Sequence, residues 1–312
     1  MVTNRQPIAS NQRLNLAHQE EVAFYLFISP WLIGFIILIL GPVIGSFILS
    51  LSEWNMAQPP VFVGINNYLT LITGDELFRK SLQVTSIWVF AGVPLQLTVA
   101  YTLALLLNQK LPGVGILRTL YYLPSVVSGV AVALLWEWIL QPQYGILNTF
   151  LRLFGIPGPP WLGSETWALP ALILMSLWST GATMVIFLAG LQSIPVELYE
   201  AAGLDGAGQI AKFFRVTLPL TTPVVLFNLV IGIIGSFQVF TQAFIMTRGG
   251  PNNATLFYVY YLYKVAFEYS RMGYASAMAW ILFVIVLVCT LAIFRSSARW
   301  VYYEGGRTGD GR

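Results

Sequence analysis

The sequence predicts an all-α membrane protein with six transmembrane helices. Of its 312 residues, 57% are hydrophobic and only 9% are charged, and the apolar residues form long runs. Soluble domains carry about 25% charged residues, and a helix crosses a bilayer with about 20 mostly apolar residues. The composition therefore excludes a soluble globule and a disordered chain. The single cysteine, Cys289, excludes an intrachain disulfide.

Six stretches are long enough to be spans: 23–51, 83–108, 120–140, 167–191, 223–246 and 275–294. The first is too long for the hydrophobic region of a cleavable signal peptide, so we expect it to remain as a span. Pro30 and Pro42 lie inside it and are expected to kink it. The chain is thus divided into a tail over 1–22, a membrane domain over 23–298 and a second tail over 299–312.

The distribution of Lys and Arg favours an orientation with both termini on the cytoplasmic side, because inner loops carry more basic residues. In this orientation the inner segments hold ten of the 16 basic residues: Arg5, Arg13, Lys110, Arg118, Lys212, Arg215, Arg295, Arg299, Arg307 and Arg312. The outer segments hold the other six: Arg79, Lys80, Arg152, Arg248, Lys264 and Arg271. One inner segment, over 192–222, is long, and inner loops of this length usually dock a partner.

Charged residues are almost absent from the predicted spans. Glu137 is the exception, and we interpret it as a carboxyl group that reaches the outer interface. Transport driven by protons or voltage usually needs titratable groups inside the membrane, so ion coupling through side chains is not expected. The chain also lacks the Gly-x-x-x-x-Gly-Lys-Ser/Thr run that binds ATP phosphates. If the protein pumps a solute, another subunit must supply the energy.

The sequence contains no pattern typical of an enzyme. Neither His-Glu-x-x-His nor Gly-x-Ser-x-Gly occurs, and these are the signatures of zinc proteases and serine hydrolases. One histidine, His18, and one cysteine are too few for a zinc cluster. We therefore expect no catalytic residue, no metal site and no cofactor on this chain.

The long inner loop, over 193–219, predicts a helix–turn–helix on the cytoplasmic face. Its first helix is expected over 195–202, where an early proline and an acidic residue are typical of a helix start. Asp205 is expected to cap a second helix over 206–216. Small residues between the helices keep the turn slim enough to enter a cleft on a partner protein. An ordinary amphipathic connector explains the same residues equally well.

The turn of this loop also resembles a known motif. The motif has two parts: Glu200-Ala201-Ala202-Gly-Leu-Asp205-Gly206 and, after nine residues, Val216-Thr-Leu218-Pro219. Together they closely resemble the EAA loop of ABC-importer permeases. Val216 stands where the family pattern has Ile. The resemblance covers nearly the whole chain. Short motifs in the outer loops are similar to those of the carbohydrate-uptake branch, which includes the maltose and glycerol-3-phosphate permeases. These motifs begin at Phe62, Trp161, Thr247, Ala266 and Gly273.

The resemblance implies the type I ABC importer permease fold and a location in a prokaryotic plasma membrane. Two permeases would form the pore, and each would insert its EAA loop into one subunit of an ABC ATPase dimer that holds ATP and Mg²⁺. A solute-binding protein would dock outside. Glu200 would pair with a basic residue of the ATPase, and Gly206 would permit the sharp turn. The complete set of implied coupling residues is Glu200, Ala201, Ala202, Asp205 and Gly206.

The implied cargo is a sugar, from a mono- to an oligosaccharide. Polar residues inside two apolar spans are expected to line its path, because sugar hydroxyls need hydrogen bonds and sugar C–H faces stack on aromatic rings. These residues are Ser176, Trp178, Ser179, Thr180 and Thr183 in the fourth span, and Ser236, Gln238 and Gln242 in the fifth. Alternatively, each Ser or Thr bonds a carbonyl of its own helix.

Two other functions are weighed against sugar import. Glycerol-3-phosphate or its diesters are an alternative cargo of the same importer type, and the lack of basic residues in the spans opposes it. A secondary transporter or a channel is a more remote alternative. The scarcity of charge inside the spans and the EAA-like loop both oppose it.

Overall fold

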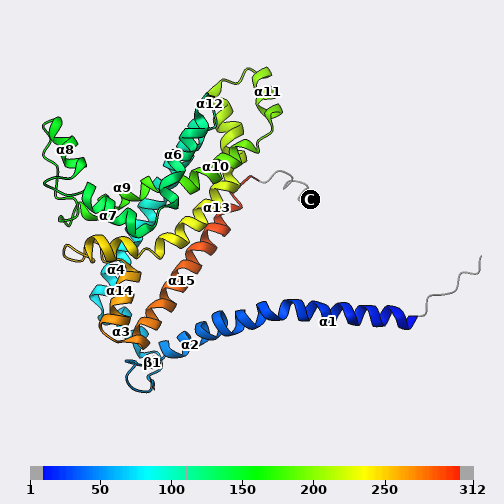
Figure 1. The fold of residues 1–312 in the computed structure, drawn as a ribbon, viewed down its shortest axis with the longest axis vertical. Helices are drawn as coiled ribbons and strands as arrows, with labels where there is room; N and C mark the ends of the chain where they lie inside the picture. The colour runs from blue at the N-terminus through cyan, green and yellow to red at the C-terminus, as the bar shows by residue number, and fades with distance from the viewer. Residues whose placement is uncertain (1–9, 110, 303–312) are drawn as a thin grey trace, which may run out of the picture.

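The chain folds into an elongated bundle of helices (Figure 1). The computed structural model describes residues 10–109 and 111–302. Four inner basic residues of the orientation count lie outside this range: Arg5, Lys110, Arg307 and Arg312. Four described helices are long and apolar enough to cross a membrane, or up to six if two bent helix pairs each count as one span. The expected all-α membrane fold is confirmed, and the six predicted stretches coincide with these helices.

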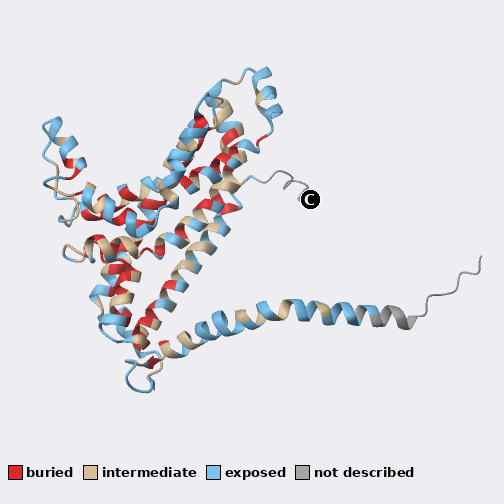
Figure 2. Ribbon diagram, viewed as in Figure 1, coloured by how far each residue is buried: buried red, intermediate tan, exposed pale blue. Residues whose placement is uncertain are grey.

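The first span projects away from the rest of the bundle. It is one continuous helix made of α1 (Ser10–Phe35), a π-helical turn η1 (Ile36–Leu40) and α2 (Gly41–Ser50). The helix therefore begins inside the predicted N-terminal tail, because polar residues continue the apolar helix toward the N-terminus. None of its most apolar 18-residue window is buried. Figure 2 shows α1 mostly pale blue, pointing away from the body.

The second and sixth spans are also continuous helices. The second span comprises α4 (Glu76–Ile87), the π-helical turn η2 (Trp88–Gly92) and α5 (Val93–Leu107), and the sixth is α15 (Met272–Ser297). The turns η1 and η2 each precede a helix that starts with a proline near its first position, Pro42 or Pro94. Proline cannot donate to the carbonyl one turn earlier, and a widened turn lets the helix continue past it.

The fifth span corrects the prediction for the inner loop. It comprises α12 (Gln209–Lys212), the π-helical turn η3 (Phe213–Thr217) and α13 (Leu218–Phe237), which form one continuous helix. The second loop helix predicted over 206–216 is therefore the start of the span and not a separate element. The helix passes Pro219 through the widened turn η3, as at η1 and η2.

Three spans are broken, which the runs of apolar residues did not indicate. The bent pairs are α6 (Val114–Val126) with α7 (Gly129–Ile139), at 100°, and α9 (Ala168–Trp178) with α10 (Gly181–Gln192), at 49°. The fifth span stops at Phe237, and a short helix over 241–247 follows. At the sharpest break Val127 and Ser128 adopt extended backbone angles, which interrupts the helical hydrogen bonds.

Shorter elements connect the spans at both ends. On the expected outer side these are β1 (Ser52–Glu53), β2 (Val61–Phe62), α3 (Asn66–Gly74), α8 (Ile146–Leu153), η4 (Ala243–Thr247), α14 (Tyr258–Tyr263) and η5 (Lys264–Glu268). β1 and β2 pair antiparallel and form the only sheet in the described ranges. On the inner side α11 (Val196–Leu204) precedes α12. In Figure 1, α11 and α12 lie at the opposite end of the bundle from α3 and β1.

Asp75 joins two spans to one of the outer elements. Its carboxyl group caps α4 by accepting the N–H of Phe78 at 2.8 Å. It also accepts the hydroxyls of Tyr261 at 2.8 Å and Tyr274 at 2.9 Å. Burial, and then the hydrogen bond to Asp75, raise the pKa of Tyr261 well above its ordinary value. The Tyr261 hydroxyl therefore stays a donor at neutral pH, and α4, α14 and α15 are held together.

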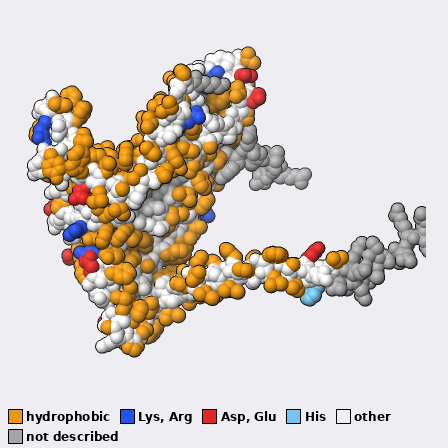
Figure 3. Space-filling view, viewed as in Figure 1, with side chains coloured by type: hydrophobic (Ala, Val, Ile, Leu, Met, Phe, Trp, Pro, Cys, Tyr) orange, Lys and Arg blue, Asp and Glu red, His pale blue; other side chains and the backbone are white. Residues whose placement is uncertain are grey.

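Two clusters of buried apolar side chains stabilise the bundle (Figure 2). The larger cluster lies around α4, α14 and the outer half of α15, and the smaller one joins α5 and α10 to the inner loop. Close helix crossing depends on Gly181, where a Cβ atom would collide with the backbone of Tyr121 and Tyr122. Elsewhere apolar side chains cover much of the visible surface (Figure 3), as a bilayer or a membrane partner requires.

Candidate translocation cavity and coupling loop

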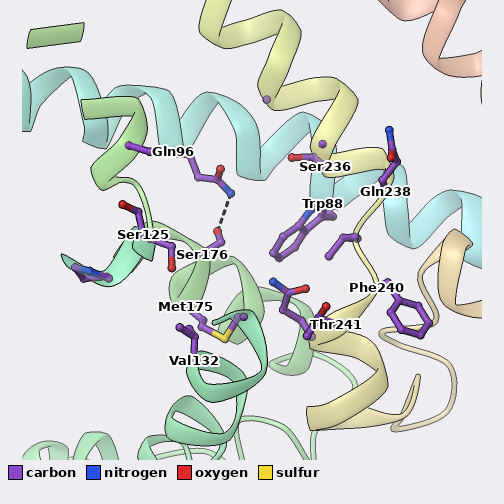
Figure 4. A pocket seen from close by; sticks show the side chains of 18 of the residues that line it. Trp88, Gln96, Ser125, Val132, Met175, Ser176, Ser236, Gln238, Phe240 and Thr241 are labelled. Atoms are coloured by element: carbon purple, nitrogen blue, oxygen red, sulfur yellow. Dashed lines mark hydrogen bonds between the residues drawn. The ribbon is translucent and has the colours of Figure 1, made fainter. Parts of the chain in front are cut away.

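The three helix breaks meet at one cavity of about 570 Å³. Its wall includes Val127 from the third span, Ser179 from the fourth and Gln238 from the fifth. Irregular backbone at membrane depth is tolerated only where protein buries it or where it lines a cavity, and transporters bind their cargo at such discontinuous helices. The volume falls within the range of about 300–1,000 Å³ for small-molecule sites. This cavity, which we call the inner cavity, is the candidate site (Figure 4).

Five of the eight residues predicted on the substrate path line the inner cavity: Ser176, Ser179, Ser236, Gln238 and Gln242. Three do not. Trp178 packs edge-to-face on Trp136, with ring centroids 6.1 Å apart. Thr180 is buried and donates to the carbonyl of Leu177 at 2.9 Å, which is the alternative of a bond within the helix. Thr183 is half-buried outside the cavity wall.

The second span contributes two cavity residues that sequence reasoning missed. Gln96 donates from Nε2 to the Ser176 hydroxyl at 2.8 Å, across from the fourth span, and Ser176 in turn donates to the carbonyl of Ile173 at 2.6 Å. Trp88 lies eight residues earlier on the same span, and both side chains are visible in Figure 4. The signal was present in the sequence, since an amide side chain inside an apolar span needs a hydrogen-bond partner.

Trp88 lines the inner cavity with a ring that is almost fully buried. Its side chain is only 3% exposed and packs edge-to-face on Phe257, with centroids 5.3 Å apart. The indole Nε1 is itself buried and has no hydrogen-bond partner among the described residues. A buried donor without a partner is costly.

The inner cavity is lined by neutral groups. Its wall in the described ranges contains amides, hydroxyls and aromatic rings, and no Asp, Glu, Lys or Arg. Across the same ranges no group of three His, Cys, Asp or Glu side chains could hold a metal ion. The arrangement can hydrogen-bond and stack a neutral polar solute, and it offers no counter-ion for a phosphate.

The inner loop forms a tight hairpin at one end of the molecule. The helix α11 ends in a Schellman motif: the Ala207 N–H donates to the Ala202 carbonyl at 2.9 Å, and the Gly206 N–H donates to the Gly203 carbonyl at 3.1 Å. Gly206 adopts the left-handed conformation, with φ of 77°, which side chains with a Cβ disfavour. The sharp turn therefore depends on this glycine.

The expected capping role of Asp205 was wrong. The residue before α12 is Gly208, which has no side chain to cap with, and Asp205 instead ends α11 with its own N–H donating to the Ala201 carbonyl. Asp205 is exposed, as are Glu200 and Ala201, whereas Ala202 is half-buried. The turn therefore presents an acidic surface together with small residues at the tip of the hairpin.

One side-chain hydrogen bond attaches the hairpin to the fifth span, and another joins the fifth span to the second. Tyr199 in α11 bonds Thr217 in η3 at 3.0 Å, and Tyr101 in α5 bonds Thr221 in α13 at 2.8 Å. Tyr199 also packs against the smaller buried cluster. The helix α11 is therefore linked to the fifth span, and the fifth span is linked in turn to the second.

The family of binding-protein-dependent transport system inner membrane components matches residues 96–301, which is more than half of the chain and includes most of the inner cavity and the whole hairpin. The chain belongs to this family. It is thus a multi-pass membrane permease of a binding-protein-dependent transport system.

Relatives match this permease over almost its full length. A probable ABC transporter permease protein of Bacillus subtilis is 44% identical over 290 residues, which cover 92% of this chain and 94% of the relative. The trehalose/maltose transport system permease protein of Thermococcus litoralis is 34% identical and covers 92% of this chain and 97% of its own length.

A solved structure confirms the expected ABC importer permease fold. A chain of the bacterial alginate ABC transporter, in complex with its alginate pentasaccharide-bound periplasmic protein, superimposes with a TM-score of 0.78 and 26% identity. The match covers 92% of this permease and 98% of that chain.

Proposed function

We propose that this permease forms half of the pore of an ATP-driven importer for saccharides in a prokaryotic plasma membrane. The observation that carries the proposal is the inner cavity, which combines neutral hydrogen-bonding groups with aromatic rings where three spans break. Sugars need this combination, because their hydroxyls form hydrogen bonds and their C–H faces stack on rings. The trehalose/maltose permease and the alginate transporter among the similar proteins support a saccharide cargo.

The same cavity opposes glycerol-3-phosphate and its diesters as the cargo. Proteins bind phosphate with Arg, Lys or helix N-termini. Within the described ranges neither Lys nor Arg lines the inner cavity. A phosphate in the inner cavity would therefore be taken out of water with no cationic side chain in the described wall to compensate it.

The energy source in this proposal is an ABC ATPase that binds ATP and Mg²⁺ and receives the inner hairpin. Leu204 at the tip is 92% exposed, and Ile210 and Phe214 beyond the turn are 77% and 61% exposed. The acid Glu200 has no salt bridge within the described residues. An apolar tip beside a free carboxyl group suits a protein groove that carries a basic residue. ATP binding would close the ATPase dimer and rock the spans as rigid bodies.

A second permease is the proposed neighbour of the first span. The helix formed by α1 and α2 has a mean hydropathy of 2.7 over its most apolar window and no buried residue there. In this chain alone its surface contacts little else than the last span. A pseudo-two-fold partner would cover this helix and complete the other half of the pore.

A solute-binding protein is proposed to deliver the saccharide from outside. The family is binding-protein-dependent, and the similar alginate transporter is solved with a periplasmic protein bound. The outer elements of this permease, from β1 to η5, form the surface on that side (Figure 1).

The test is reconstitution of this permease with its second permease, its ATPase and its binding protein in liposomes. Maltose, trehalose, glucose, maltotriose and alginate tri- and pentasaccharides are added in turn. We expect at least one sugar-loaded binding protein to stimulate ATP hydrolysis and uptake into the vesicles. The ATPase-free assembly serves as the control.

Two results contradict the proposal. If no saccharide stimulates hydrolysis while glycerol-3-phosphate does, the cargo is a phosphate ester. If uptake persists at an equal rate without the ATPase, the chain acts as a secondary transporter or a channel.

A further inference from the structure

A second cavity of about 560 Å³ lies at the outer end of the bundle. It is formed by α7, the segment around η4, α14 and η5, and its lining includes Glu137, Phe244, Arg248, Tyr260 and Glu268. In Figure 3 acidic and basic side chains gather at the outer edge of the molecule, beside the elements that form this wall. We call this space the outer cavity. Its volume is close to that of the inner cavity and is again within the range of small-molecule sites.

A strip of three aromatic rings joins the two cavities. Phe240 lines the inner cavity and Phe244 lines the outer one. Their rings are stacked, with centroids 5.2 Å apart and planes at 20°. Tyr260 lies beside both, at 6.2 Å from Phe240 and 6.3 Å from Phe244. Phe240 and Phe244 are one helical turn apart, which corresponds to about 6 Å along the helix. This distance is close to the length of one sugar ring.

The ring nearest the outer cavity is available for contact. Phe244 is 42% exposed, although it sits in a ring cluster with Tyr260 and Tyr263. An apolar face that remains open beside polar groups matches the alternation of C–H faces and hydroxyls on a sugar. Phe240 and Phe244 cover one face of each other by stacking, so the exposed part of Phe244 is the surface that a solute can contact.

The polar groups of the outer cavity balance in charge. Glu137 comes from α7, Arg248 directly follows η4 and Glu268 ends η5. Lys264 lies 3.8 Å from Glu268, so the four formal charges sum to zero. Neither Glu137 nor Arg248 forms a salt bridge with a described residue. A free carboxyl group accepts hydroxyl protons and a free guanidinium donates to hydroxyl oxygens, so together these groups can recognise a polyol.

We propose that the outer cavity is an entrance subsite that holds a second sugar unit of the cargo. The strip Phe240–Phe244–Tyr260 then passes sugar units one after another into the inner cavity. This inference rests on the saccharide import proposed above and narrows its cargo. An importer with two adjoining sugar subsites favours saccharides of two or more units over monosaccharides.

The experiment uses the complete reconstituted complex and four forms of this permease. Phe244→Leu keeps an apolar side chain but removes the ring, and Phe244→Tyr restores a ring. The matched control is Phe267→Leu, which removes an exposed outer ring that lines neither cavity. The probes are glucose, maltose, trehalose, maltotriose and the alginate tri- and pentasaccharides. Uptake is measured by mass spectrometry of the vesicle contents, and ATP hydrolysis is measured in parallel.

We expect Phe244→Leu to lower the uptake of di- and longer saccharides per ATP hydrolysed by about five-fold. A reduction of this size corresponds to the loss of one aromatic contact. Stimulation of ATP hydrolysis by loaded binding protein should persist, which shows that the variant folds and assembles. Phe244→Tyr should recover uptake, and Phe267→Leu should behave as the unmodified chain. Any uptake of glucose should be insensitive to Phe244→Leu.

Several outcomes overturn the inference while saccharide import stands. These are unchanged uptake of longer saccharides in Phe244→Leu, an equal loss in Phe267→Leu, an equal loss for glucose, and transport of glucose alone. If no saccharide stimulates hydrolysis in the unmodified complex, the proposed function itself is wrong, and the inference is overturned with it.

Discussion

At the scale of single residues, polar side chains in this permease serve two purposes besides bonding a carbonyl of their own helix. Some hold elements together, as Asp75 does for α4, α14 and α15. Others line a cavity, as Gln96 and Gln238 do. Sequence reasoning found the second kind only in part, because a hydroxyl that satisfies its own helix, such as Thr180, looks the same in the sequence as one that lines a path.

Asp75→Ala tests the first purpose. The change removes a helix cap and two hydrogen bonds to a carboxyl group, and we expect it to cost about 2–4 kcal/mol. The measurement is the unfolding temperature of the detergent-purified chain by intrinsic tryptophan fluorescence. Asp205→Ala is the matched control, because Asp205 is exposed and makes no side-chain hydrogen bond within the described ranges. Equal unfolding temperatures for the two variants would contradict the structural role of Asp75.

At the scale of elements, hydropathy predicted where the spans lie but not how they are shaped. An average over about 20 residues does not detect a two-residue interruption such as Val127-Ser128, although Pro124 and Gly129 on either side were local signals of it. Hydropathy also missed the start of α1, because the polar residues that extend this helix toward the N-terminus do not add to its hydropathy. Because the inner cavity forms at the breaks, the missed breaks explain why Trp88 and Gln96 were missed as well.

The turn after α11 offers a sharp test at this scale. Gly206 and Gly208 both have open space where a Cβ would be, but only Gly206 has a positive φ. Gly206→Ala should therefore strain the turn by about 1–2 kcal/mol. Gly208→Ser should be tolerated, since serine is a favourable residue before a helix. In the reconstituted complex we expect Gly206→Ala to lower the uptake per ATP hydrolysed, whereas Gly208→Ser should leave it unchanged. A lower uptake per ATP in Gly208→Ser than in Gly206→Ala would exclude the turn as the coupling element.

At the scale of the whole molecule, the chain leaves much of its own apolar surface uncovered. Its described surface carries many large exposed apolar side chains, and the first span has no cover of its own. Part of that surface faces lipid and part is proposed to face a second permease. Half of the proposed pore wall is therefore absent from this chain, and its sequence alone cannot identify the sugar.

A photo-crosslinking amino acid at Leu38 separates lipid from protein at this surface. Leu38 lies in η1 and is 74% exposed. On illumination of membranes that contain the assembled importer, we expect a covalent adduct with the second permease, detected as a band of summed mass. The chain expressed alone should give no such band. An active importer without the adduct would show that the first span faces lipid only.

The continuous helix Gln209–Phe237 has a mechanical consequence. Its 29 residues form a rod of about 43 Å, at 1.5 Å per residue. One end of the rod adjoins the hairpin and the other stops at the edge of the inner cavity, beside Gln238. If one end is fixed, a tilt of about 10° moves the other by about 7 Å, which is more than the length of a sugar ring. The fifth span can therefore act as a lever arm, which would convert a small rotation at the hairpin into a displacement of this size at the wall of the inner cavity.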